Sequence, residues 1–369
     1  MRVVSRAECL INKLCGRGSL SKKELAYLLS RRISSGDERL LFRRADSLRG
    51  SHAGGGIIVR GIVEFSNICR NRCVYCGLNS GNVRLRRYCM TTEEILACAR
   101  AIYNSGIRSI VLQSGESASI GAEWLAEVIK RIKNLYPAAV TISAGERSRS
   151  DYALLKKAGA DRYLLKIETT CAVLYRRLHP GMRLKTRLLC LRALKELGYQ
   201  TGSGCITGLP GQTAESIAED LLFFRRSGMG MISIGPFIPH PRTPLSACAP
   251  ADPVPALRAI ALARLLNPYA HIPVTTALRR SSGREAYKAL ECGANVVMFN
   301  FTPAVFRHLY NLYPGRSKAR FDSGRELGEL RAYAARAGRK LDFSRGDFNQ
   351  TAEIPGFQAG FTCRNSTLP

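Results

Sequence analysis

The sequence predicts an α/β protein built on a TIM-like (β/α)8 barrel, with an N-terminal helical extension and a short C-terminal tail. After Arg60, short apolar runs of strand-forming residues alternate with longer amphipathic runs, the pattern of repeated βα units around a parallel sheet. Eight of the short runs are predicted strands, at residues 61–65, 109–113, 140–143, 162–167, 200–206, 231–235, 272–276 and 295–300. They fall within residues 57–313, close to the roughly 250 residues of such a barrel. An open doubly wound sheet, the main alternative, usually has fewer strands and a glycine-rich phosphate turn that this sequence lacks.

The longer runs have the 3.6-residue periodicity of helices that bury one face. We predict these helices at residues 92–105, 123–135, 150–158, 185–197, 214–227, 254–265 and 282–291. The first begins at a Thr-Thr-Glu-Glu cap, and several end at a glycine, such as Gly106 and Gly198, where a helix C-cap is expected.

Two extensions flank the barrel, which we place at residues 51–315. Residues 1–50 are predicted to be helical, because Ser21 and Glu24 have the spacing of a capping box before an apolar run. This basic, acid-poor segment is also typical of an organelle transit peptide, but the cap favours a folded helix. Residues 316–369 contain one predicted helix at 324–337 and then lose periodicity, so we expect a partly flexible tail.

Composition limits the cellular setting. Charges interrupt every apolar run before it reaches the length of a membrane span, so we expect no membrane segment. The 13 cysteines are odd in number and follow no secretory signal, which favours the reducing cytoplasm over a disulfide framework. Most of them, such as Cys98, Cys190 and Cys292, are expected to be small buried apolar residues.

The net charge of +28 is extreme and would suit a polyanionic partner. However, no short Lys/Arg run interleaved with aromatic residues marks a nucleic-acid site. A composition-biased basic surface is the simpler interpretation, and we predict no nucleic-acid partner.

Three cysteines lie on one short loop after the first predicted strand, at Cys69, Cys73 and Cys76. In a barrel of this type, that loop lies on the C-terminal face, where the chemistry takes place. Thiolates of this kind bind iron–sulfur clusters, and a 4Fe-4S cubane with three protein ligands keeps one iron open. The alternative is a structural zinc site, which needs four ligands. The nearest further candidates, Cys89 and His52, do not have ordinary zinc spacing.

Polar residues also follow other predicted strands. Strand alternation places Lys166 and Glu168 on the same side, facing the barrel lumen, where a carboxylate needs a partner or a ligand. Arg187 could bind a carboxylate, although by itself a solvated helix arginine is the simpler interpretation. Thr275 and Thr276 would suit an anion but are also ordinary strand formers.

The Cys-x3-Cys-x2-Cys spacing, with Tyr75 before the last cysteine, resembles the radical S-adenosylmethionine superfamily. More specifically, stretches such as VEFSNICRNRCVYCGL, TISAGERS, LHPGM, GLPGQT and ANVVMFNFTPAVFRHLYNLYPG resemble the HydE family of FeFe-hydrogenase maturases, over roughly residues 20–315. The resemblance implies a barrel of the radical S-adenosylmethionine type and two cofactors, a 4Fe-4S cluster on the three cysteines and S-adenosyl-L-methionine on its open iron.

The resemblance also implies roles for residues around the barrel mouth. Ser114, Gly115 and Glu116 resemble the element that receives the methionyl amino group, and Arg187 would contact the methionyl carboxylate. Glu168 would contact the ribose. The adenosine would be bordered by Tyr75, Pro236, Phe237 and Ile238, and the substrate by Lys166, Thr275, Thr276 and Tyr310. The implied substrate is a cysteine-bound iron carbonyl-cyanide unit, and the implied partners are a reducing ferredoxin or flavodoxin and other hydrogenase maturases.

Two departures from that family stand out. Lys166 replaces a usual arginine, and the C-terminal region lacks the second cysteine cluster of many members, with only Cys363 there. We therefore expect no second cluster, and a diverged substrate stays open. The remaining alternatives are a methylornithine synthase-like or biotin synthase-like enzyme and, more remotely, a zinc-stabilised basic nucleic-acid-binding protein.

Overall fold

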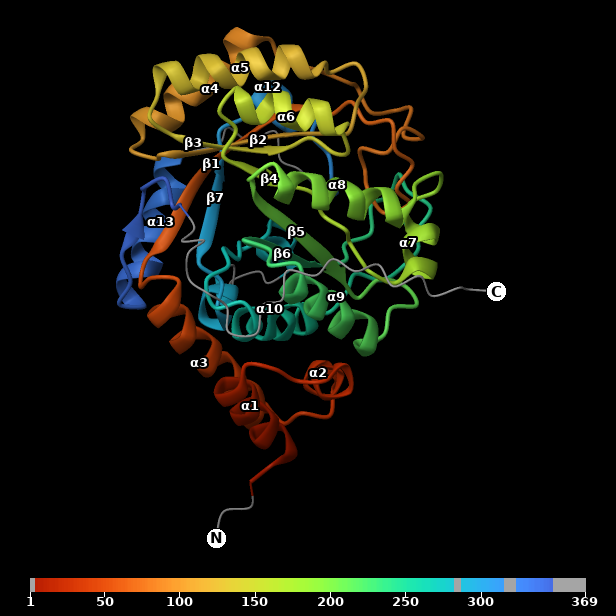
Figure 1. Ribbon diagram of the computed structural model, residues 1–369, viewed down its shortest axis with the longest axis vertical. Helices are drawn as coiled ribbons and strands as arrows, with labels where there is room; N and C mark the ends of the chain where they lie inside the picture. The colour runs from red at the N-terminus through yellow and green to blue at the C-terminus, as the bar shows by residue number, and fades with distance from the viewer. Residues whose placement is uncertain (1–3, 282–286, 315–322, 348–369) are drawn as a thin grey trace.

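The protein is a barrel of parallel strands wrapped by helices, as the computed structural model in Figure 1 shows. The structure describes residues 4–281, 287–314 and 323–347. Seven strands pair in parallel in the order β6-β5-β4-β3-β2-β1-β7. They are β1 (Ile57–Ser66), β2 (Ser109–Ser114), β3 (Ala139–Ser143), β4 (Arg162–Leu164), β5 (Gln200–Thr207), β6 (Met231–Pro236) and β7 (Val296–Asn300). The predicted parallel α/β barrel is confirmed.

The segment between β6 and β7 closes the barrel without forming a regular strand. His271 bridges to Met231 of β6, and Pro273 bridges to Val296 of β7. The predicted strand at 272–276 was therefore wrong, since only single bridges form there. The physical reason is a helix start: the Thr275 hydroxyl accepts a hydrogen bond from the Leu278 amide at 3.3 Å, so the chain turns into a helix at Thr276.

Helices cover the outside of the strands (Figure 1). They are α4 (Thr92–Asn104), α5 (Ala122–Leu135), α6 (Arg149–Lys157), α7 (Ala172–Leu178), α8 (Leu184–Glu196), α9 (Ala214–Arg226), α10 (Val254–Leu266), α11 (Thr276–Ser281), α12 (Ala304–Arg307) and the 3-10 helix η2 (Lys288–Cys292). The predicted cap at Thr91 is present, because Thr91 and Glu94 form a capping box at the start of α4. The predicted helix 282–291 overlaps only η2, since residues 282–286 lie outside the described residues.

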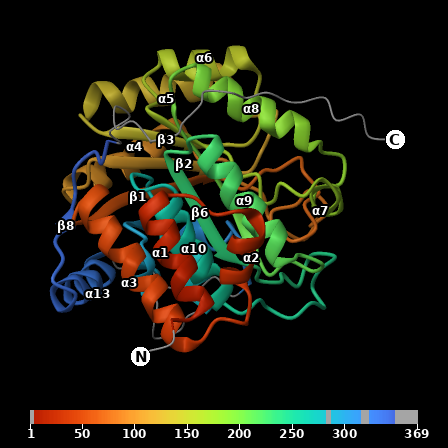
Figure 2. The same ribbon diagram turned by 60° about the horizontal axis from the view of Figure 1, so that its bottom comes forward.

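Three helices precede the barrel: α1 (Arg6–Arg17), α2 (Lys22–Leu29) and α3 (Ser35–His52). The predicted capping box starts α2, because Ser21 accepts from the Glu24 amide at 3.3 Å and donates its own amide to the Glu24 carboxylate at 2.8 Å. Figure 2 shows these helices in front of α9 and α10. Every residue of α10 from Ala256 to Leu266 is buried, because this helix lies between the barrel and the N-terminal extension.

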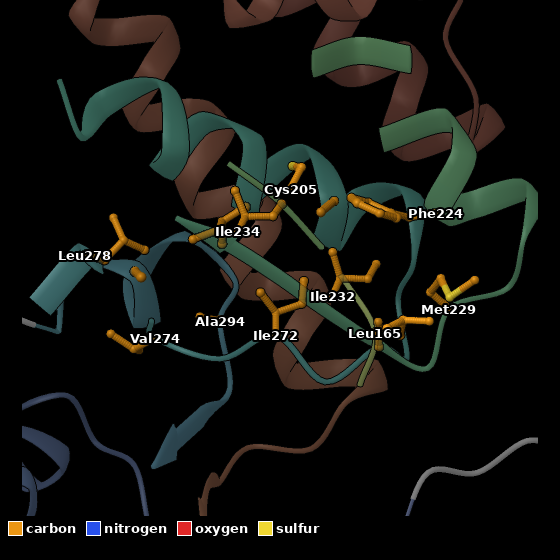
Figure 3. Close-up of a cluster of buried hydrophobic side chains, with 14 of the residues drawn as sticks. Leu165, Cys205, Phe224, Met229, Ile232, Ile234, Ile272, Val274, Leu278 and Ala294 are labelled. Atoms are coloured by element: carbon orange, nitrogen blue, oxygen red, sulfur yellow. The ribbon is translucent and has the colours of Figure 1, made fainter. Parts of the chain in front are cut away.

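The core continues from the strands to the helices that cover them. Figure 3 shows Cys205 and Ile234 on the sheet packed together with Phe224 of α9. Cys98, Cys190 and Cys292 are buried as predicted, and every cysteine in the described residues is a free thiol. None of the described helices has the length and apolar composition needed to cross a membrane.

The described part of the C-terminal extension returns to the barrel through α13 (Ser323–Arg336) and a short strand that the sequence did not predict, β8 (Leu341–Asp342), which pairs with the start of β1. Beyond β8 the chain crosses the N-terminal end of the strands. Arg162 of β4, with no exposed surface, donates to the carbonyl oxygens of Arg345 and Gly346 at 2.7 Å and to Asp347 at 2.9 Å. These contacts form the barrel floor, opposite the end where the strands point.

Candidate functional site

A cavity of about 820 Å³ occupies the end of the barrel toward which the strands point. Every site residue predicted from the sequence lines it. These residues are Cys69, Cys73, Tyr75, Cys76, Ser114, Gly115, Glu116, Lys166, Glu168, Arg187, Pro236, Phe237, Ile238, Thr275, Thr276 and Tyr310. The lining also includes Ser143 of β3, Ile206 of β5 and Asn300 of β7, so residues from every strand end surround one volume.

The three cysteines lie on a loop that follows β1 and is held by hydrogen bonds to its own backbone. Arg87 donates to the carbonyl oxygens of Asn67, Leu78 and Asn79 at 2.7 to 2.8 Å. Asn79 in turn donates its side-chain amide to the Cys76 carbonyl oxygen at 2.7 Å. Because these side chains satisfy the polar groups of an irregular loop, the positions of the cysteines are fixed in advance. Sequence reasoning missed both residues.

The thiols are partly shielded from water and close enough to influence one another. Burial, together with the neighbouring thiols, raises the pKa of Cys73 well above its usual range, and burial followed by Cys69 raises that of Cys76 to about 12. Burial also raises the pKa of Cys69. Such thiols become thiolates when a cation replaces their protons, so this donor set fits a positively charged iron cluster.

No group of three His, Cys, Asp or Glu side chains in the described residues is arranged to hold a single metal ion. A cubane does not require such an arrangement, because each cysteine binds a different iron.

Gly115 at the end of β2 lets this strand approach the cysteine loop. A Cβ atom at this position would lie 2.3 Å from the Ile68 carbonyl oxygen and 2.9 Å from Cys69 Cβ. The Gly115 amide donates to the Ser66 carbonyl oxygen at 3.0 Å, and the Arg70 amide donates to the Glu116 carbonyl oxygen at 2.7 Å. Only glycine therefore fits between these two chain segments.

Beside Gly115, two acidic and two basic residues form one network. Arg187 lies 2.8 Å from Glu146 and 3.7 Å from Glu116, while Arg70 lies 3.0 Å from the other Glu116 oxygen. Arg187 is only 8% exposed, so the solvated-arginine interpretation was wrong. Although burial opposes it, Tyr175, Glu146 and Glu116 raise the pKa of Arg187, which remains a fixed cation. Glu146 was not predicted as a site residue, although it lies in the quoted TISAGERS stretch.

Across the cavity, Lys166 Nζ lies 3.0 Å from Glu168 Oε2, so both side chains face the lumen as predicted and form a pair. Glu168 has a φ of 60°, and it is the only residue other than glycine with a positive φ in the described ranges. A glutamate in this region is strained by about 1 kcal/mol or more and persists only where its surroundings hold it.

Asp220 of α9, whose carboxyl group is fully buried, helps to hold the chain segment that follows Glu168. It accepts hydrogen bonds from the Thr170 amide at 2.5 Å and the Thr170 hydroxyl at 2.6 Å, two residues after Glu168. Burial raises the pKa of Asp220 to about 7. Asp220 carried no signal in the sequence, because it appears as an ordinary helix acid.

The aromatic side of the cavity is fixed by His179. The His179 Nδ1 atom lies 3.1 Å from the Tyr175 carbonyl oxygen, which leaves Nε2 to accept from the Tyr75 hydroxyl at 2.9 Å. Burial, and then the nearby Arg187, lowers the pKa of His179 to about 4, so the ring stays neutral. Phe237 belongs to a small apolar cluster with Leu174 and Leu178, and Tyr75 packs against this cluster. The quoted LHPGM stretch contains His179, but no role was predicted for this residue.

Deeper in the barrel, the lining becomes a mixture of amide, carboxylate and phenol groups. Asn300 donates to Glu64 at 2.9 Å, and Gln113 donates to the buried Tyr310 hydroxyl at 3.0 Å. The Thr275 hydroxyl faces the Ile234 carbonyl oxygen at 3.3 Å, which places it at the cavity wall. Glu64, buried on β1, is another lining residue that was not predicted.

Comparisons with known proteins agree with this arrangement. Residues 63–224 match the Radical SAM superfamily model, and residues 233–341 match the Biotin and Thiamin Synthesis associated domain. The chain is 47% identical over 283 residues to the FeFe-hydrogenase maturase subunit HydE of Thermotoga maritima, covering 76% of this chain and 80% of the relative. It is 29% identical over 280 residues to the 3-methylornithine synthase of Methanosarcina acetivorans, covering 75% and 79%.

Among solved structures, that of methylornithine synthase (PylB) superposes with a TM-score of 0.74 at 24% identity, covering 90% of this chain and 97% of the other, which shows a shared fold. The identity to the Thermotoga HydE, at 47%, is higher than the 29% identity to the 3-methylornithine synthase, so the chain is more similar to HydE. The chain belongs to the HydE family of the radical S-adenosylmethionine superfamily.

Proposed function

We propose that this protein is a radical S-adenosylmethionine enzyme that acts in maturation of the FeFe-hydrogenase active site. The observation that carries the proposal is the placement of three cysteine thiols on one braced loop at the mouth of an 820 Å³ cavity. The 47% identity to a hydrogenase maturase supports the biological role over that of methylornithine synthase, at 29%.

Cys69, Cys73 and Cys76 would bind a 4Fe-4S cluster with one iron open. When bound, the cluster and S-adenosyl-L-methionine supply a one-electron cleavage of a C–S bond, which gives methionine and a 5′-deoxyadenosyl radical. The residues of the chain bind and orient the reactants and exclude water from them.

Each side of the cavity mouth suits one part of S-adenosyl-L-methionine. The backbone of Ser114, Gly115 and Glu116 would receive its amino group, and Arg187, a permanent buried cation, would pair with its carboxylate. Glu168, held in its strained conformation, would accept from the ribose hydroxyls. Tyr75 and the segment Pro236, Phe237 and Ile238 would border the adenine.

The deeper lining would hold the substrate, a small molecule or a cysteine-bound iron carbonyl-cyanide unit. Lys166, Thr275, Thr276 and Tyr310 line this part and offer a cation and three hydroxyl groups. We place the enzyme in the cytoplasm, with a barrel at 51–315 between extensions at 1–50 and 316–369, and with other hydrogenase maturases as partners.

The proposal is tested by anaerobic reconstitution with iron and sulfide, followed by dithionite and S-adenosylmethionine. We expect a brown protein that forms 5′-deoxyadenosine, and a Cys73→Ala variant that loses both properties. Cys98→Ala, a thiol buried on α4, is the matched control and should retain both. A fully reconstituted natural protein that forms no 5′-deoxyadenosine would overturn the proposal, and formation of 3-methylornithine would transfer it to the sibling enzyme.

A further inference from the structure

Exposed basic side chains lie on the cysteine loop and on the chain segments that are hydrogen-bonded to it. We call this set the basic face, and its members lie on the loop, on α7, at the start of α8 and after β6. These are Arg70, Arg72, Arg84, Arg86, Arg176, Arg177, Arg183, Lys185 and Arg242. The segments that carry them, residues 67–90, 171–187 and 236–248, contain no aspartate or glutamate. Every Asp, Glu, Lys or Arg side chain in these three segments is therefore a cation.

Hydrogen bonds join the three segments into one surface. The Val74 amide donates to the Leu178 carbonyl oxygen at 3.0 Å, and the Leu245 amide donates to the Val74 carbonyl oxygen at 3.3 Å. The Asn79 side chain donates to the Arg242 carbonyl oxygen at 3.5 Å. In Figures 1 and 2, α7 lies beside the orange segment that follows β1.

The charge of the basic face is almost uncompensated. Arg70 pairs with Glu116, but the other eight side chains make no ion pair within the described part of the chain. A surface of one sign attracts partners of the opposite sign and raises their association rate by about 10- to 1000-fold.

Two apolar side chains on the same segments favour a protein partner. Val83 of the cysteine loop is 90% exposed, and Val173 of α7 is 60% exposed. Apolar contacts surrounded by charges are typical of protein interfaces. Single-stranded nucleic acids bind instead on aromatic side chains, and the large apolar residues exposed in the described ranges are all valine or leucine.

We propose that the basic face is the docking surface for a small acidic electron-transfer protein. This inference rests on the proposed function, because the cofactor held by the cysteines must gain one electron before each turnover. The donor loses that electron and the acceptor on the cysteine loop gains it, and no bond to the protein forms or breaks. A donor docked on the basic face would lie against the same loop that carries the three cysteines.

The test compares two triple variants. Arg84→Glu, Arg176→Glu and Arg183→Glu together reverse the basic face, while Arg31→Glu, Arg32→Glu and Arg39→Glu make the same change on exposed residues of the N-terminal extension. Each reconstituted protein is supplied with an acidic ferredoxin kept reduced, or with saturating dithionite, and 5′-deoxyadenosine is measured. Binding of the oxidised ferredoxin is measured separately by fluorescence anisotropy, at low and high salt.

For the face variant, we expect the ferredoxin-driven rate constant and the ferredoxin affinity to fall at least about tenfold at low salt, with an unchanged dithionite-driven rate. The control variant should resemble the natural protein in all three measurements. Equal ferredoxin affinity in both variants would overturn the proposal. If even the natural protein forms no 5′-deoxyadenosine with dithionite, the proposed function fails, while the binding measurement still decides the docking surface.

Discussion

Substitution of Gly115 tests whether the cysteine loop and the end of β2 must touch. In Gly115→Ala the new Cβ would lie 2.3 Å from the Ile68 carbonyl oxygen, whereas ordinary contacts begin at 3.4 Å. The two segments must therefore separate by about 1 Å, and Cys69, whose Cβ lies 2.9 Å away, must move with them. Overpacking of this kind destabilises a protein by about 1 to 3 kcal/mol, and a misplacement of about 1 Å at a reacting site lowers rates by up to about 100-fold.

The assay measures iron per chain after reconstitution and the initial rate of 5′-deoxyadenosine formation with dithionite. We expect Gly115→Ala to bind less iron, and the iron-loaded fraction to react at least about tenfold more slowly. Gly50→Ala is the control, because no atom lies within 4 Å of its added Cβ on α3. If Gly115→Ala and Gly50→Ala both match the natural protein within a factor of about two, the close contact does not position the cysteines.

Three further perturbations test other parts of the structure. Because burial raises the pKa of the Asp220 carboxyl to about 7 from an ordinary value of 3.8, its contribution to stability is present at low pH and is lost as the pH rises toward 7. Asp220→Asn should flatten this part of the pH profile of the unfolding free energy, and an unchanged slope in urea titrations would contradict that role. Arg187→Lys keeps the charge but loses the planar fork, so cofactor affinity measured by calorimetry should fall about tenfold, whereas Arg183→Lys on the exposed side should leave it unchanged. Equal affinities would show that Arg187 does not bind the cofactor. Arg162→Met should lower the unfolding free energy by about 2 to 4 kcal/mol without reducing iron binding, since Arg162 lies at the barrel floor; loss of iron in a protein of unchanged stability would refute this separation.

Features that lie close together in the sequence could be predicted from it. The cysteines are contiguous on one loop, and the helix caps at Ser21 and Thr91 need only residues three positions apart. The alternation of side chains along the predicted strand at 162–167 placed Lys166 and Glu168 in the same lumen, although the strand itself, β4, ends at Leu164. Local patterns of this kind depend on nearby residues, so they predict structure without knowledge of the rest of the chain.

The residues that brace the site could not be predicted, because their partners are distant in the sequence. Asp220 is 50 positions from Thr170, and Tyr75 is 104 positions from His179. By itself each of them looks like an ordinary helix acid or loop residue. The strand predicted at 272–276 was wrong for a related reason. The β-branched residues of this segment predict a strand, but the Thr275 hydroxyl caps a helix that begins at the next residue.

The floor contacts of Arg162 also constrain the order in which the molecule forms. Its partners Arg345 and Gly346 leave the ribosome 183 and 184 residues after Arg162 itself. Until they are synthesised, a guanidinium that has no exposed surface in the finished protein lacks three of its hydrogen-bond acceptors. The cysteine loop needs Leu309, whose carbonyl oxygen accepts from the Asn67 side chain at 2.8 Å, so the last contacts of this end are synthesised late but still before those of Arg162, and the floor is the last part of the barrel to close.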